Sequence, residues 1–136
     1  MPVHGPRPLL LDLDGTLIDS RQDLAAAVNL LLEELGLPPL PLDEVCSYIG
    51  RGARSLIRRS LDAADPGRTV PRDAPVLRGF LAHYSSVILD TTVPFPGVVA
   101  GLEVLKAAGV PMAVVTNKPI EPARVCLDGL ALTGYF

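Results

Sequence analysis

The chain has 136 residues, of which 49% are hydrophobic and 20% charged, a composition typical of a single globular domain. Its net charge is −3 without any run of lysine and arginine, which argues against nucleic acid or an anionic membrane as a partner and favours small ligands. The sequence contains neither an apolar run of transmembrane length nor the core of a signal peptide, and its two distant cysteines, Cys46 and Cys126, suit buried thiols in a reducing cytoplasm.

The first segment that suggests chemistry is residues 9–17, LLLDLDGTL. Its continuous apolar start predicts a short strand buried on both faces, as in parallel sheets with helices above and below. Asp12 and Asp14 would lie at the carboxyl end of this strand, where open α/β sheets form their sites. Two neighbouring carboxylates repel one another unless a cation, or a division of labour between nucleophile and acid/base, makes use of them. The pair therefore predicts a functional site, the alternative being a solvated Asp-Gly turn.

Helix after helix is predicted beyond the aspartate pair. Asp19 or Ser20 can cap a helix whose apolar residues recur at helical spacing as far as Leu35, and Gly36 ends it. Further helices are expected to open at residue 41 and to span residues 55–64 and about 73–87. Together these helices predict a small bundle.

The remaining chain returns to the alternation of an α/β protein. Residues 92–97, TVPFPG, predict a stiff linker that marks a boundary. A helix is then expected over residues 98–108, a strand over 112–116 and a helix over 120–130. The predicted fold class is α/β, a partial Rossmann-like core with a parallel sheet, interrupted by a helical cap. We expect residues 1–18 and 92–136 to form the core and residues 19–91 the cap.

Thr116 lies at the carboxyl end of the second predicted strand, just as Asp12 does at the first, and Asn117 follows it. If the two strands are parallel neighbours, their carboxyl ends share one crevice. The Thr116 hydroxyl and the Asn117 amide could then donate hydrogen bonds to a phosphoryl group as its charge redistributes. The alternative is that both residues only shape the turn or cap the next helix.

Residues 12–17 (DLDGTL) resemble the first motif of the haloacid dehalogenase superfamily, and residues 115–117 (VTN) resemble its second. Residues 49–53, 94–98 and 114–119 resemble segments of its phosphoglycolate phosphatase branch, in which a helical cap follows the first motif. The resemblance implies a Mg²⁺-dependent phosphatase of small phosphorylated hydroxy acids.

The resemblance also implies roles for individual residues. Asp12 would attack phosphorus and become an aspartyl phosphate, while Asp14 would protonate the leaving alkoxide and later assist water. Mg²⁺ would be held by the Asp12 side chain, the Asp14 backbone carbonyl and the phosphate itself. Thr16, Thr116 and Asn117 are expected to contact the substrate. An aspartate at position 14 argues against a dehalogenase, whose branch lacks this second acid.

The loop Gly50, Arg51 and Gly52 lies in the expected cap, where the family places residues that choose the substrate. A flexible loop with guanidinium groups suits a small carboxylate such as that of phosphoglycolate, the alternative being a solvated arginine-rich helix face. Lys118 is expected only to shape its turn, because the family's phosphate-binding lysine belongs to a third motif further along. His4 and His83 are expected to be surface or packing residues.

The third and fourth motifs of the family are not found before the chain ends at Phe136. Two core strands alone would leave an unpaired sheet edge, and without the third-motif lysine and a fourth-motif acid we expect weak or no activity from this chain by itself. Two alternatives remain open. The chain could be a non-catalytic remnant or binding module, or it could be related to the phosphosugar mutases of the same superfamily.

Overall fold

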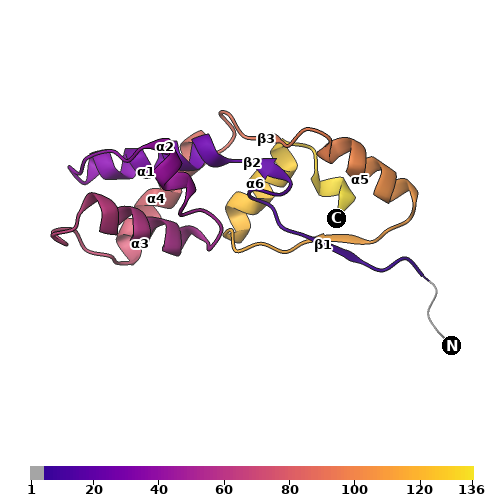
Figure 1. Ribbon diagram of the computed structural model, residues 1–136, viewed down its shortest axis with the longest axis horizontal. Helices are drawn as coiled ribbons and strands as arrows, with labels where there is room; N and C mark the ends of the chain where they lie inside the picture. Colours follow the sequence, from indigo (N-terminus) through magenta and orange to yellow (C-terminus); the bar gives the residue numbers. More distant parts are fainter. Residues whose placement is uncertain (1–4) are drawn as a thin grey trace.

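The computed structural model describes residues 5–136, which form a helical lobe and an α/β lobe joined by a short two-stranded ribbon (Figure 1). His4 lies outside the described residues. The helical lobe consists of α1 (Arg21–Glu34), α2 (Leu42–Cys46), α3 (Ala53–Ala64) and α4 (Ala74–Val87). The α/β lobe consists of β1 (Leu9–Leu11), β4 (Met112–Val114), α5 (Val98–Ala107), α6 (Ile120–Gly129) and the short 3₁₀ helix η1 (Thr133–Tyr135). The ribbon consists of β2 (Ile18–Asp19) and β3 (Val93–Pro94).

The predicted helices of residues 19–91 are confirmed. Helix α1 buries the apolar side chains that recur along one face, and it packs mainly against α4. Asp73 caps α4, because its side chain accepts a hydrogen bond from the Val76 backbone N–H at 3.3 Å. One turn apart on α4, Phe80 and Tyr84 are buried and stack with their ring centroids 5.8 Å apart. These two aromatic rings anchor the inner face of the helical lobe.

The two predicted core strands are parallel neighbours, as expected. Leu9 pairs with Met112, and the pairing continues to Leu11 opposite Val114, so both strands end at the same edge. The expected burial of the first strand is wrong, because Leu9 is 36% and Leu10 65% exposed. Among the described residues the sheet has only these two strands, and it therefore lacks the neighbours that would bury its apolar side chains.

The segment predicted to be a stiff linker is partly a strand. Val93 and Pro94 pair antiparallel with Asp19 and Ile18, and the Phe95 N–H donates to the Leu17 carbonyl at 3.0 Å. Both connections between the lobes therefore run side by side in this ribbon, which lies between the lobes in Figure 1. We propose that the boundaries of the cap lie here, at residues 18/19 and 91/92, because both chain crossings occur at this point.

A buried aspartate reinforces this crossing. Asp23 is 2% exposed, and its carboxylate accepts hydrogen bonds from the backbone N–H and the hydroxyl of both Thr91 and Thr92 at 2.6 to 3.1 Å. Burial acts to raise the pKa of Asp23, but the hydrogen bonds from Thr92 and Thr91 outweigh it and hold the pKa below its ordinary value. The first turn of α1 is thus tied to the chain as it returns to the α/β lobe.

The cysteines and histidine only partly follow expectation. Cys126 is fully buried, whereas Cys46, at the end of α2, is only half-buried, so the expectation of two buried thiols holds for Cys126 alone. His83 is half-buried and contacts Glu34, in agreement with a packing residue. Within residues 5–136 no helix combines the length and apolarity needed to cross a membrane.

Candidate active site

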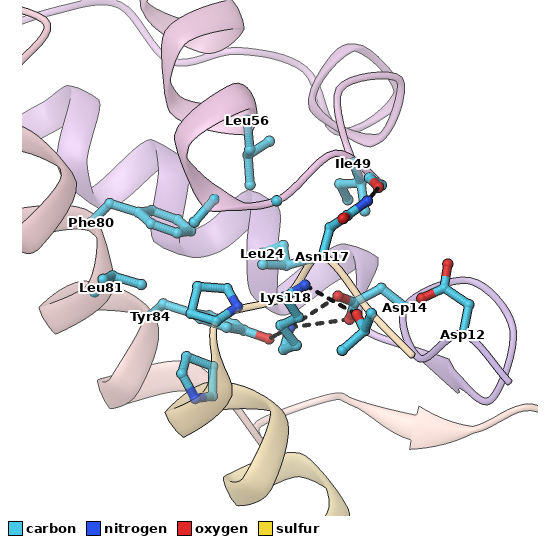
Figure 2. Close-up of a pocket in the computed structure, with 16 residues that line it drawn as sticks. Asp12, Asp14, Leu24, Ile49, Leu56, Phe80, Leu81, Tyr84, Asn117 and Lys118 are labelled. Carbon is cyan, nitrogen blue, oxygen red and sulfur yellow. Dashed lines mark hydrogen bonds and ion pairs between the residues drawn. The ribbon is translucent and has the colours of Figure 1, made fainter. Parts of the chain in front are cut away.

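A pocket opens where the helical lobe meets the carboxyl ends of β1 and β4 (Figure 2). It encloses about 470 Å³ of empty space, its open mouth included. The α/β lobe contributes polar residues and two prolines, namely Asp12, Asp14, Thr116, Asn117, Lys118, Pro119 and Pro122. The helical lobe contributes a mainly apolar wall of Leu24, Ile49, Gly50, Gly52, Ala53, Leu56, Phe80, Leu81 and Tyr84. The pocket therefore has a polar floor and an apolar wall.

Asp14 is held by a network of polar side chains. The Lys118 ammonium donates to its two carboxylate oxygens at 3.1 and 3.2 Å, and the Ser20 hydroxyl donates to Oδ1 at 2.6 Å. The same ammonium donates to the Tyr84 hydroxyl at 2.7 Å and lies 4.6 Å from the centre of the Tyr84 ring. Burial raises the pKa of Tyr84 far above its ordinary value, so the phenol stays neutral.

Asp12 has a different environment. Its side chain is exposed, and Oδ1 accepts a hydrogen bond from the adjacent Leu13 N–H at 2.7 Å. Figure 2 shows its carboxylate at the rim of the pocket, outside the dashed network that joins Asp14, Lys118 and Tyr84. The two carboxylates are thus distinguished by their surroundings, one open to the pocket and one paired with a cation. Such a difference is what separate chemical roles require.

Thr116 and Asn117 reach the same pocket from β4. The Thr116 hydroxyl oxygen accepts a hydrogen bond from the Lys118 N–H at 3.0 Å, a contact that shapes the turn. The Asn117 side-chain amide donates to the Gly50 carbonyl of the helical lobe at 3.0 Å. The parallel strands therefore bring Asp12, Asp14, Thr116 and Asn117 to one crevice, and whether the last two bind a substrate remains a prediction.

A model of the haloacid dehalogenase-like hydrolase family matches residues 9–136. The chain belongs to this family. Phosphoglycolate phosphatase of Caulobacter vibrioides is 41% identical over 128 residues, which cover 94% of this chain and 54% of that protein. Phosphoglycolate phosphatase of Pseudomonas putida is 42% identical over 135 residues, covering 96% of this chain and 48% of that protein.

A solved structure agrees with the fold of this chain. The crystal structure of a predicted phosphoglycolate phosphatase from Haemophilus somnus superposes with a TM-score of 0.88 at 32% identity, covering 96% of this chain and 60% of that one. The expected α/β fold and the resemblance to the haloacid dehalogenase superfamily are thereby confirmed. The chain spans about half the length of the curated relatives that it matches.

The loop at residues 50–52 touches the turn after β4. Gly52 has a φ of +86°, and a Cβ placed there would lie 2.9 Å from the Asn117 carbonyl oxygen. The site therefore needs glycine both for its left-handed backbone and for the close approach of two loops. Gly50 also has a positive φ, of +121°, and lies in open space.

Replacing Gly52 with alanine is expected to destabilise the chain by about 1 to 3 kcal/mol, because strain at positive φ adds to the contact with Asn117. Urea unfolding measures this change. Gly97→Ala is a control for positive φ alone, since Gly97 has the same φ of +86°, although its ψ is −11° against 170° at Gly52, and no atom lies within 4 Å of the added Cβ. Equal destabilisation by the two substitutions would show that the contact with Asn117 contributes nothing.

Two of the predicted substrate contacts lie outside the pocket. Thr16 and Arg51 are exposed, and neither is among the lining residues, although Gly50 and Gly52 on either side of Arg51 are. Arg54 does not line the pocket either. The roles of Thr16 and Arg51 in substrate binding therefore stay predictions that this geometry does not support directly.

Sequence reasoning missed three residues of the site. The turn role expected of Lys118 is confirmed for its backbone, but its side chain, only 3% exposed, is the cationic partner of Asp14. Tyr84 was expected only as a helix residue, yet its hydroxyl binds Lys118. Ser20 was expected only as a helix cap, yet its hydroxyl binds Asp14. One signal was present in the sequence, because Lys118 is the basic residue nearest to the end of the second strand.

The oxygen donors of the pocket fit magnesium. Within residues 5–136 no group of three or more His, Cys, Asp and Glu side chains could hold a metal ion. Lys118 and Ser20 engage the Asp14 carboxylate, which leaves Asp12 as the open carboxylate of the pocket. Magnesium retains several waters and binds through one or two carboxylates together with substrate phosphate, so a single protein carboxylate at a phosphate site suits it.

Proposed function

We propose that this chain carries the phosphoryl-transfer site of a Mg²⁺-dependent phosphatase that acts on small phosphorylated hydroxy acids of the phosphoglycolate type. The observation that supports it most is the pair of carboxylates in unlike environments at one pocket. Asp12 is open to the pocket, and Asp14 is paired with Lys118. The relatives named phosphoglycolate phosphatase, at 41% and 42% identity, suggest the substrate class.

In the proposed reaction an Asp12 carboxylate oxygen attacks phosphorus. The new O–P bond forms as the bond from phosphorus to the substrate oxygen breaks. Asp14 enters this step in its protonated form, gives its proton to the departing oxygen and becomes the carboxylate that pairs with Lys118. Water then attacks the phosphorus of the aspartyl phosphate, with Asp14 accepting a proton, and Asp12 and inorganic phosphate are released. Thr116 and Asn117, at the floor of the pocket, would donate hydrogen bonds to the phosphoryl oxygens.

Magnesium would be held by the Asp12 carboxylate, with the Asp14 backbone carbonyl and the phosphate as further oxygen ligands. It would neutralise charge on the phosphoryl group as the attacking and leaving oxygens exchange. Within the described chain, Lys118 is the only cationic side chain that lines the pocket, and its charge is already paired with Asp14. We therefore expect slow turnover by this chain.

The test is hydrolysis of phosphoglycolate by the purified chain with and without magnesium. Phosphate release is expected with Mg²⁺, to be lost on addition of EDTA and to return when Mg²⁺ is restored in excess, because the pocket offers few other positive charges. Absence of both phosphate release and a phosphorylated protein in the presence of Mg²⁺ would contradict the proposal. Isomerisation of a sugar phosphate without release of phosphate would favour the mutase alternative.

A further inference from the structure

We propose that Lys118 is a positioning residue for Asp14, fixing its carboxylate for proton transfer while Tyr84 fixes Lys118 from the helical lobe. This inference rests on the proposed function, because it assigns Asp14 the proton transfer of that reaction. It concerns a lysine in the turn after β4, for which sequence reasoning expected only a role in shaping that turn.

The contacts of Lys118 hold its ammonium group from two directions. The ammonium donates to the Asp14 carboxylate, whose Oδ1 and Oδ2 lie 3.1 and 3.2 Å from Nζ, and to the hydroxyl of Tyr84. The Tyr84 ring packs against the same group at 4.6 Å, and the Lys118 side chain is 3% exposed. A buried cation held between a carboxylate and a phenol in this way restricts the orientation of its carboxylate partner.

The two oxygens of Asp14 are not equivalent. Oδ1 accepts hydrogen bonds from both Ser20 and Lys118, at 2.6 and 3.1 Å. Within the described chain, Oδ2 has Lys118 as its only partner, at 3.2 Å. Oδ2 therefore has the greater capacity to exchange a proton with the substrate, and its direction depends on Lys118. Without the ammonium, the hydrogen bond from Ser20 alone would hold the carboxylate. The carboxylate could then rotate about its Cβ–Cγ bond.

The same contacts argue against a substrate-binding role for Lys118. A lysine that binds the carboxylate of a substrate needs its charge free and its ammonium open to the pocket. Lys118 is instead paired with Asp14 and nearly inaccessible to solvent. Tyr84 approaches from α4, so the chain of contacts from Tyr84 through Lys118 to Asp14 also joins the two lobes across the pocket, as Figure 2 shows.

The test compares two substrates that differ in their need for a proton. The alkoxide of phosphoglycolate needs protonation as it leaves, whereas the nitrophenolate of p-nitrophenyl phosphate leaves readily as an anion. In Lys118→Met we expect the rate of phosphoenzyme formation from phosphoglycolate to fall by about 10²-fold with KM little changed, since misplacing a catalytic group costs about this much. The rate with p-nitrophenyl phosphate should change far less.

Two variants serve as controls. Lys118→Arg keeps the positive charge and should recover part of the lost rate. Lys106→Met removes the only other lysine of the chain, which lies exposed on α5, and should leave both rates unchanged. If Lys118→Met does not fold, Tyr84→Phe, which removes only the hydroxyl that holds Lys118, should cause a smaller loss of the same kind.

Other outcomes would overturn either the positioning role of Lys118 or the proposed phosphatase function. A higher KM for phosphoglycolate alone, with an unchanged rate, would show that Lys118 binds the substrate carboxylate and would overturn the positioning role. Equal losses with both substrates would do the same. If the unmodified chain with Mg²⁺ yields neither free phosphate nor a phosphorylated protein, the proposed function fails. In that case a double-mutant cycle of unfolding with Asp14→Asn and Lys118→Met decides, since non-additive effects support the pairing and additive effects overturn it.

Discussion

Replacing Asp12 with asparagine is expected to abolish phosphoryl transfer, lowering the rate by on the order of 10³-fold or more. An amide oxygen is a poor nucleophile, and the proposed reaction has no other route to a phosphorylated protein. The fold should be unaffected, because Asp12 is exposed and an asparagine Oδ1 can still accept the Leu13 N–H. The measurement is single-turnover release of phosphate, together with the mass of the acid-quenched protein.

Asp43→Asn is the matched control for this experiment. Asp43 is an exposed aspartate in the first turn of α2 and does not line the pocket, so its amide variant should retain the original rate. Unfolding curves for both variants should coincide with that of the original chain. Phosphorylation of the Asp12→Asn protein at an undiminished rate would show that the nucleophile is another residue.

Replacing Asp23 with alanine is expected to lower the free energy of unfolding by roughly 3 to 5 kcal/mol. The substitution leaves the N–H groups and hydroxyls of Thr91 and Thr92 without their buried acceptor, and each such donor is costly to leave unpaired. Urea unfolding measures the loss. Asp90→Ala is the local control, because Asp90 is exposed just before the same threonines and should change stability by less than about 0.5 kcal/mol.

Acidification should remove the contribution of Asp23. Its pKa is lower in the folded chain than the ordinary value of 3.8, so the folded state favours the ionised form. The stabilisation is fully present above the unfolded pKa and is lost as the pH falls through the folded one. The difference in stability between the original chain and Asp23→Asn should therefore shrink below about pH 4. A difference that stays constant on acidification would contradict this account.

Local patterns in the sequence predicted the helices well. The fourth helix was expected over residues 73–87 and is found at Ala74–Val87, because Asp73 caps it and apolar residues recur along one face. The last helix, expected over residues 120–130, is found at Ile120–Gly129. Spacing and capping are properties of neighbouring residues, so they can be recognised without knowing what the helix packs against.

The predictions failed where partners are distant in the sequence. Asp14 and Lys118 are separated by 104 positions, and Asp23 and Thr91 by 68, so no local pattern marks either pair. The burial of β1 was overestimated for a related reason. An apolar run predicts a strand, but its exposure depends on how many other strands and helices surround it, and Leu10 here has few.

The β2–β3 ribbon has a consequence for how the chain could be rebuilt. Ile18 and Pro94 are paired residues of an antiparallel ribbon, so their Cα atoms lie only about 4.5 to 5.5 Å apart. The chain enters the helical lobe and returns from it at nearly the same point. A short linker across that point would bypass residues 19–93 without displacing either flanking segment, which makes the helical lobe a replaceable module in protein engineering.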